Sequence, residues 1–395
     1  MKIIYIANNW IEDGSSAVYA TYNVWGMAAA GIETHLVVRN VSDGPTDKLL
    51  RSYFDLERPK HLHIHRIDKK LGKANLEFYW KAARLVNRLA DEATAVISRT
   101  PKILPHLLWR KNRKYRIYYE THNFFQDLDR RDDLPRKNFS LRKTAMQERF
   151  AVGRLDGLIC LTHTLEKLWR EYVDVPIHVI YPGVRGPHAD FPSSADHAIS
   201  GETADSLFTG PAADKVNLAY TGTLNSVRGI RQMLEMAGCL PGNYKVYLFG
   251  GKKPSEMEHM RSDIREMGVE GRVEVTGWLP QSQLQERLGQ MHAGLLPLKD
   301  NFFNRYLTAP SKFFDYLSHA LPTIASSLPA LDELVVENGV GISVNWNDPQ
   351  QAAKKIAALI EDAGRYKQLR NNAFRFALEH TWKKRGQRIA AALFE

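Results

Sequence analysis

The sequence of 395 residues has few cysteines and no long apolar run. The two cysteines, Cys160 and Cys239, lie far apart in apolar surroundings, which argues against a disulfide framework or a metal site. We expect two buried thiols in a reducing cytosol. No stretch approaches the roughly 20 apolar residues that cross a bilayer. The short apolar start, residues 1–7, is broken at Asn8 and predicts a first strand and not a secretory signal.

The glycine pattern of dinucleotide-binding proteins, G-x-G-x-x-G, is also missing. Only Gly14 lies between Ala7 and Gly26, which argues against an enzyme that uses NAD or FAD. Gly14, followed by Ser15, would let the backbone approach a phosphate or sugar closely. A plain turn glycine is the alternative.

Acidic residues are fewer than basic ones, and the formal net charge is +10. Residues 1–180 hold 30 Lys and Arg against 21 Asp and Glu, so the first half carries nearly all of the excess. A basic half suits an anionic partner, such as nucleic acid, a membrane surface or a phosphorylated or lipid-linked acceptor. We do not expect nucleic acid, because no zinc-ligand spacing, basic zipper or RNA-binding signature accompanies the charge. A solvated surface without a partner explains it as well.

Short β-branched or aromatic runs alternate with longer amphipathic stretches, a pattern typical of α/β proteins with parallel sheets covered by helices. We predict strands at residues 3–7, 34–39, 95–98, 116–119, 158–161 and 177–180 of the first half. In the second half we predict strands at residues 216–220, 245–249, 272–276, 294–298, 323–325 and 341–344. Apolar residues at helical spacing predict a helix with one face on the first sheet: Leu76, Tyr79, Trp80, Ala83, Val86 and Leu89.

The composition changes between residues 183 and 214 to Gly, Pro, Ser, Ala and Asp, which predicts a linker. We therefore expect one Rossmann-like domain at residues 1–182, a second at 215–380, and a final helix at 381–395. Ligands of such sheets bind outside the carboxyl ends of the strands.

Several segments, taken in order, resemble the retaining glycosyltransferase family 4. In the second half they are residues 220–224 (YTGTL), 227–230 (VRGI), 248–251 (LFGG), 275–279 (VTGWL), 309–317 (APSKFFDYL) and 320–326 (ALPTIAS). In the first half they are residues 120–123 (ETHN) and 181–184 (YPGV). Two positions depart from the family's usual pattern: Leu307 stands at its first glutamate and Thr223 at its diphosphate-binding arginine.

The resemblance implies the GT-B fold, with two facing Rossmann-like domains and a C-terminal helix that crosses back to the first. It implies a cytoplasmic enzyme that moves a sugar, with retention and without metal or cofactor, from a nucleoside-diphosphate sugar to a hydroxyl. The acceptor would be a glycan, a lipid-linked molecule or a small molecule, in cell-surface polysaccharide or glycoconjugate assembly. The alternatives are a nucleotide-sugar epimerase of GT-B type and a catalytically silent nucleotide-binding partner in a polysaccharide-assembly complex.

Glycosyl transfer must stabilise the negative charge that grows on the departing diphosphate, which arginine, lysine and helix N-termini can do. Arg228 precedes a predicted helix, and Lys312 opens another, so we assign both to this role. A turn arginine and an ordinary helix start are the simpler explanations. Asp315, one turn after Lys312, would accept hydrogen bonds from the donor ribose or pair with Lys312. The implied donor-binding set is Gly14, Ser15, Gly222, Thr223, Gly250, Gly277, Trp278, Ser311 and Asp315.

His122 follows a predicted strand, so we expect it to position the transferred sugar or the acceptor hydroxyl. Family members need no enzymatic nucleophile, and we do not assign Glu120 as a base. Residues 127–129 fit the D-x-D string of metal-dependent transferases, but an ion-paired surface loop explains them better, and we expect no metal site. The basic and apolar mixture of residues 126–154 is typical of a segment at an anionic membrane, although a solvated face over a core explains it too.

Overall fold

The computed structural model describes residues 1–8, 10, 15–40, 43–68, 76–109, 112–135, 138–185, 215–224, 229–251 and 253–395. For Ser15, Gln281 and Ser282 it describes the backbone and not the side chain. These residues form two compact units. The first unit contains Met1–Gly183 and His380–Glu395, and the second contains Val184–Glu379. Most of the expected linker, residues 186–214, lies outside the described residues.

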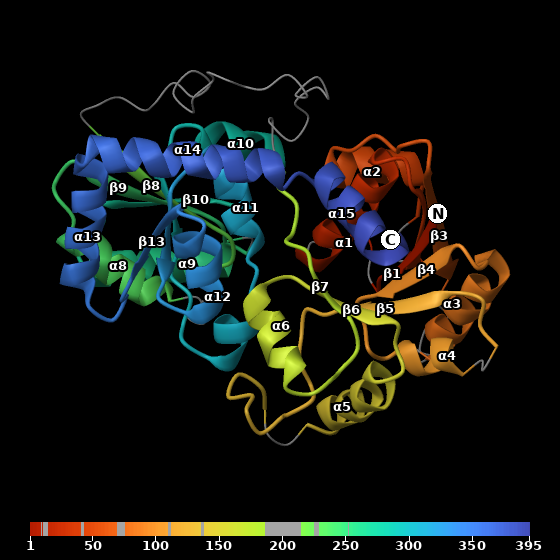
Figure 1. Ribbon diagram of the computed structural model, residues 1–395. Coiled ribbons are helices and arrows are strands. Elements are labelled where there is room, and N and C mark those ends of the chain that lie inside the picture. The colour runs from red at the N-terminus through yellow and green to blue at the C-terminus, as the bar shows by residue number, and fades with distance from the viewer. Residues whose placement is uncertain are drawn as a thin grey trace. The chain divides into compact units, whose positions relative to one another are not determined.

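A parallel sheet of seven strands forms the centre of the first unit, in the order β3-β2-β1-β4-β5-β6-β7 (Figure 1). Its strands are β1 (Lys2–Ile6), β2 (Glu33–Asn40), β3 (Leu62–Asp68), β4 (Thr94–Ser98), β5 (Arg116–Glu120), β6 (Gly157–Cys160) and β7 (Ile177–Val179). The order reverses between β1 and β4, which is the position where Rossmann-like sheets bind ligands at their carboxyl edge.

Helices cover both faces of this sheet, so the central residues of its inner strands are apolar and buried. They are α1 (Ser15–Ala29), α2 (Thr46–Phe54), α3 (Leu76–Leu89), α4 (Leu104–Leu108), α5 (Phe139–Val152), α6 (His163–Arg170) and the C-terminal α15 (Trp382–Phe394). In Figure 1, α1, α2 and α15 lie on one face, and α3, α4 and α5 lie on the other.

Helix α15 packs tightly against α1 at two glycines. A Cβ atom on Gly26 would come within 2.1 Å of the Trp382 carbonyl oxygen, and one on Gly386 within 2.6 Å of the Gly26 carbonyl oxygen. Ile389 and Leu393 of α15 belong to the same buried cluster as Ile3 and Tyr5 of β1. The end of the chain therefore completes the core of the first unit.

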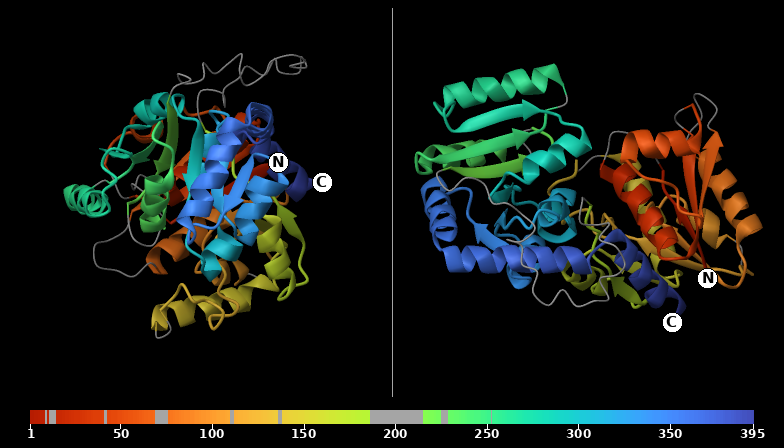
Figure 2. Two further views of the ribbon diagram at one scale, coloured as in Figure 1. Left: turned by 90° about the vertical axis from the view of Figure 1, so that its left-hand side faces the viewer. Right: turned by 90° about the horizontal axis from the view of Figure 1, so that it is seen from above.

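The second unit repeats this plan with a parallel sheet of six strands, in the order β10-β9-β8-β11-β12-β13 (Figure 2). Its strands are β8 (Val216–Thr221), β9 (Tyr244–Phe249), β10 (Val273–Gly277), β11 (Ala293–Leu296), β12 (Thr323–Ser326) and β13 (Gly341–Val344). The helices are α8 (Ile230–Cys239), α9 (Pro254–Glu266), α10 (Gln281–Leu288), α11 (Ser311–Leu317), α12 (Pro329–Leu331), α13 (Pro349–Glu361) and α14 (Ala363–Glu379). The order reverses between β8 and β11.

All twelve predicted strands are present within two residues of the predicted ends. The structure also contains one strand that was not predicted, and two other expectations are wrong. Strand β3 was not predicted, because His and Arg alternate with its apolar residues. Leu76 and Trp80 of α3 are exposed, since the buried side of this helix contains Phe78 and Ala82 instead. Cys239 ends α8 in an exposed position, and only Cys160 is buried.

Candidate functional site

Two glycine turns meet at the carboxyl ends of β8 and β9, next to the point where the second sheet reverses its order. The Gly222 amide donates to the Phe249 carbonyl oxygen at 2.9 Å, and Gly222 has a φ of +122°, which favours glycine. A Cβ atom on Gly250 would lie 1.8 Å from the Gly222 carbonyl oxygen. Both positions therefore require glycine. Gly222 is exposed at this edge of the sheet, whereas Gly250 is buried against it.

The carboxyl ends of β8 and β9, where Gly222 and Gly250 lie, are called the glycine edge below. The Lys312 ammonium lies at this edge, beside Gly222. Its Nζ atom is 3.9 Å from the ring centroid of Tyr220, the fifth residue of β8, and 3.0 Å from where a Cβ of Gly222 would stand. The Tyr220 hydroxyl donates to the Thr223 carbonyl oxygen at 2.9 Å, which fixes the ring beneath the ammonium. A cation over an aromatic face is held by the ring quadrupole. The structure thus brings together Gly222, Thr223, Gly250 and Lys312.

Helix α11, which carries Lys312, is anchored to the strand ends by Tyr316. The Tyr316 hydroxyl donates to the Leu295 carbonyl oxygen at 3.1 Å and accepts from the Thr221 amide at 3.1 Å. Gly294 leaves room for its ring, because a Cβ there would be 2.1 Å from it. Ser311 is the exposed first residue of α11, and the capping position belongs to Pro310.

Asp315 is buried on α11, and its carboxylate is bound by Arg185. The Arg185 Nη2 atom donates to both carboxylate oxygens, at 2.9 and 3.0 Å, and Nε donates to Oδ1 at 3.2 Å. The side chains of Asp315 and Arg185 are 6% and 15% exposed. A carboxylate has about four lone-pair sites, so this pairing orients Asp315 and leaves acceptor capacity on it.

The end of β10 adjoins the same glycine turns through Met257. A Cβ on Gly251 would be 2.4 Å from the Met257 sulfur, and one on Gly277 would be 3.6 Å from its methyl carbon. Trp278 follows Gly277 and is 59% exposed. Gly14 and Arg228 lie outside the described residues, and Ser15 is described only as the start of α1.

The corresponding edge of the first unit contains a fully buried carboxylate, Glu120, at the end of β5. It accepts hydrogen bonds from the hydroxyls of Tyr5 and Tyr19, and it forms an ion pair with the buried Arg385 of α15. Burial raises the pKa of Glu120, but the adjacent His122 and the charges of Arg385 and Arg99 outweigh this and hold the pKa below its usual range. Glu120 is thus an ionised structural group that ties α15 to β5.

His122 follows β5 and accepts a hydrogen bond at Nε2 from the Arg99 Nε atom at 2.7 Å. Burial and the neighbouring Arg99 charge lower the pKa of His122 to about 4, so the ring is neutral at pH 7. Because Nε2 is an acceptor, the neutral ring carries its proton on Nδ1. About a fifth of the His122 side chain is exposed, 22%, so the ring offers a donor at the sheet edge.

The D-x-D string has a structural role in the first unit. The Asp127 carboxylate accepts from the amide of Asp129 at 3.1 Å, and Arg130 pairs with Glu171 at 2.7 Å. Within the described part of the chain, no group of three or more His, Cys, Asp or Glu side chains is arranged to hold a metal ion.

Arg99, Arg185 and Tyr220 are among the residues of these sites that were not predicted from the sequence. Arg99 directly follows the apolar strand β4, and a charged residue in that position is a detectable signal. Arg185 pairs with a residue 130 positions away, and no local pattern shows such a pairing.

Comparisons with known proteins agree with this architecture. Residues 16–185 match the model of the family described as Glycosyltransferase Family 4, and residues 215–362 match that of Glycosyl transferases group 1. No curated protein matches the sequence. None of the described helices is long and apolar enough to cross a membrane.

Several solved structures share the fold at low sequence identity. Sucrose-phosphate synthase from Thermosynechococcus elongatus is 15% identical, with a TM-score of 0.71 and coverage of 99% of this chain and 97% of its own. HepE (Alr3699) from Anabaena, in complex with UDP, is 15% identical, with a TM-score of 0.67 and coverage of 100% and 99%. WaaG, a glycosyltransferase involved in lipopolysaccharide biosynthesis, is 12% identical, with a TM-score of 0.65 and coverage of 99% of both chains. With both halves matched by family models and with this fold, the chain belongs to the GT-B glycosyltransferases described as Glycosyltransferase Family 4 and Glycosyl transferases group 1.

Proposed function

We propose that the protein transfers a sugar from a nucleoside-diphosphate sugar to an acceptor hydroxyl with retention of configuration and without a metal ion. The observation that carries this proposal is the Lys312 ammonium, held over Tyr220 at the glycine edge of the second sheet. The exposed backbone of Gly222 lets a diphosphate approach, and the ammonium stabilises the negative charge that develops on it.

The donor nucleotide lies, in this proposal, along the ends of β8, β9 and β10. Asp315 accepts hydrogen bonds from the ribose hydroxyls while Arg185 keeps its carboxylate oriented. The exposed ring of Trp278 is available to the base. We propose uridine as the base, because HepE has been solved with UDP and UDP-glucose and an E. coli trehalose-6-phosphate structure with UDP-2-fluoro glucose.

His122 positions the transferred sugar or the acceptor hydroxyl through its Nδ1–H group. Glu120 is not a nucleophile, because it is fully buried and already engaged by Tyr5, Tyr19 and Arg385. We propose that the leaving phosphate takes the acceptor proton, so that attack and departure occur on one face of the sugar. The acceptor class is a glycan, a lipid-linked molecule or a small molecule, in polysaccharide or glycoconjugate assembly in the cytoplasm.

A thermal-shift experiment with UDP, GDP, ADP and CDP, each with and without EDTA, tests the donor assignment. A ligand that binds only the folded state at a hundred times its Kd adds about 2.7 kcal/mol, which corresponds to a shift of roughly 5–10 °C. We expect UDP to produce this shift with or without EDTA. Lys312→Met, which keeps the side-chain stem and removes the charge, should reduce the shift without changing the melting temperature of the free protein.

Each part of the proposal can be contradicted by a separate result. A shift that disappears in EDTA contradicts metal independence, and a shift by every nucleotide except UDP contradicts the base. Binding of UDP-sugars without transfer or hydrolysis favours a silent nucleotide-binding partner. Conversion of the donor without an acceptor favours an epimerase. The anomeric configuration of the product, read by proton NMR, decides between retention and inversion.

A further inference from the structure

Exposed apolar side chains gather on three neighbouring helices of the first unit. Within the described parts of the chain, ten large apolar residues are exposed, and six belong to α3, the end of α4 and α5. They are Leu76, Trp80, Trp109, Phe139, Met146 and Phe150. Helix α4 contacts both α3 and α5, so the three helices form one surface, which we call the α3–α5 face (Figure 1). Such gatherings mark interaction sites.

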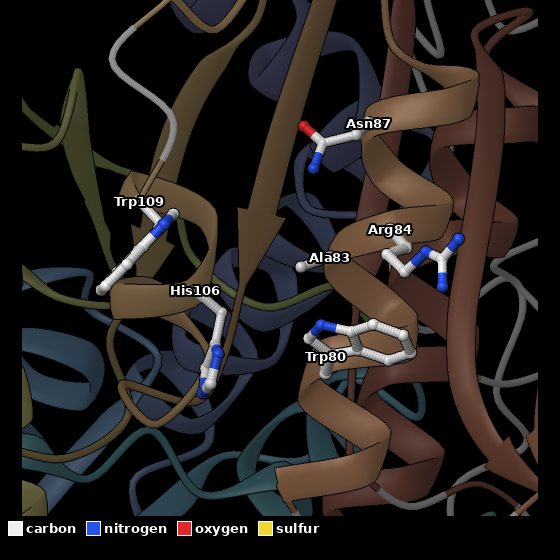
Figure 3. Close-up of a pocket in the computed structure, with 6 residues that line it drawn as sticks. All are labelled: Trp80, Ala83, Arg84, Asn87, His106 and Trp109. Atoms are coloured by element: carbon white, nitrogen blue, oxygen red, sulfur yellow. The ribbon is translucent and has the colours of Figure 1, made fainter.

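Trp109 and Trp80 are the largest of these side chains. Trp109 is 87% exposed and Trp80 is 53% exposed. The two indoles border a pocket of about 390 Å³ between α3 and α4, and the close-up shows them on adjacent helices on either side of it (Figure 3). The Arg84 guanidinium lies 4.6 Å from the Trp80 ring centroid, so a cation accompanies the indole.

Cations stand between the apolar residues along the same helices. On α5, Arg142, Lys143 and Arg149 are exposed beside Phe139, Met146 and Phe150, whereas its single acidic residue, Glu148, is buried. Residues 76–154 hold 18 Lys and Arg against 9 Asp and Glu, so this segment accounts for the basic excess of the first half.

This alternation favours a lipid surface over a protein partner. A protein interface concentrates its apolar residues in a dry centre and places charges at the rim. At a bilayer surface, indole and phenyl rings lie at the headgroup level while neighbouring Arg and Lys side chains meet lipid phosphates. On the α3–α5 face the two kinds of residue are interleaved within single helical turns.

We propose that the α3–α5 face docks the protein on a bilayer that contains anionic lipids. The aromatic side chains insert among the headgroups, and the basic side chains bind the negative surface. This inference is independent of the donor and acceptor proposed above, since it rests on a surface and not on the glycine edge of the second unit.

Co-sedimentation with vesicles tests the proposal. We expect the full-length protein to bind vesicles of equal parts phosphatidylcholine and phosphatidylglycerol, not phosphatidylcholine alone, and to dissociate as salt rises. Arg142→Glu with Lys143→Glu should lower the partition coefficient by about tenfold or more, since each basic residue near the surface contributes about 1 kcal/mol. Trp80→Ser with Trp109→Ser should lower it by about tenfold through lost insertion.

Matched variants control for general effects of charge and aromatic residues. Lys354→Glu with Lys355→Glu reverses two exposed lysines of α13, and Tyr53→Ser removes an exposed ring of α2. Both should bind vesicles like the unaltered protein. All variants should keep the circular dichroism spectrum and the UDP-induced thermal shift. Absence of binding to anionic vesicles, or equal losses in the control variants, would overturn the proposal even where nucleotide binding is intact.

Discussion

At the scale of single residues, the buried carboxylates of Asp315 and Glu120 are each held by a partner that is distant in the sequence. Asp315 pairs with Arg185, which is 130 positions away, and Glu120 with Arg385, which is 265 positions away. The sequence predicts that Glu120 directly follows a strand and that Asp315 lies on a helix, one turn after Lys312. It does not predict their partners, because such pairings depend on how the whole unit folds.

The buried environment of Glu148, on α5, predicts how the stability of the protein changes with pH. It accepts hydrogen bonds from the Tyr119 hydroxyl and the Phe125 amide, and burial raises its pKa to about 7. Because the folded state then holds the proton more tightly than the unfolded state, Glu148 makes the protein less stable as pH rises from about 4.5 to 7. The loss is on the order of 3 kcal/mol, since one pKa unit corresponds to about 1.4 kcal/mol.

Glu148→Gln removes this titration, so the variant should gain stability relative to the unaltered protein as pH rises from 5 to 8. Urea unfolding at several pH values measures the difference in the free energy of unfolding between the two proteins. Glu92→Gln, at an exposed carboxyl of the same unit, is the control. A difference that stays constant with pH would show that Glu148 is ionised throughout.

At the scale of helices and strands, sequence patterns predict buried elements well. The inner strands are covered on both faces, so they read as short apolar runs, and their predicted ends agree with the structure. The edge strand β3 was missed because Leu62 and Ile64 alternate with His63 and His65. Helical spacing predicted α3 but not which side is buried, since Trp80 fits the apolar pattern and is exposed on the α3–α5 face.

Gly250, in the turn that follows β9, allows a prediction about stability and nucleotide binding. Gly250→Ala would place a Cβ 1.8 Å from the Gly222 carbonyl oxygen, so one of the two turns must shift. We expect a loss of stability of about 1–3 kcal/mol and loss of the UDP-induced thermal shift. Gly242→Ala, where no atom lies within 4 Å of the new Cβ, should change stability by no more than about 0.5 kcal/mol. Normal nucleotide binding by Gly250→Ala would remove the β8 and β9 turns from the donor site.

At the scale of the whole molecule, the sequence predicts two Rossmann-like units and a final helix that returns to the first. The structure shows which residues of this helix contribute to the first unit. Arg385 neutralises the buried Glu120, Trp382 packs on Gly26, and Ile389 and Leu393 fill the core beside β1. The first unit therefore depends on a segment that follows the whole second unit in the sequence.

A chain that ends at Glu379 should accordingly leave the first unit unfolded while the second stays folded. Loss of Arg385 leaves Glu120 buried without its cation, at a cost of about 3–5 kcal/mol. Loss of Ile389 and Leu393 adds about 2–5 kcal/mol for each side chain, so the total is comparable to the 5–15 kcal/mol stability of a typical domain. Hydrogen exchange read by mass spectrometry should show fast exchange in β1, β4 and β5 and slow exchange in β8, β9 and β11, which serve as the internal control. A peptide of residues 380–395 should restore slow exchange in the first unit, because it supplies Arg385 and both apolar side chains; slow exchange without the peptide would show that β1 and its neighbours form a stable core alone.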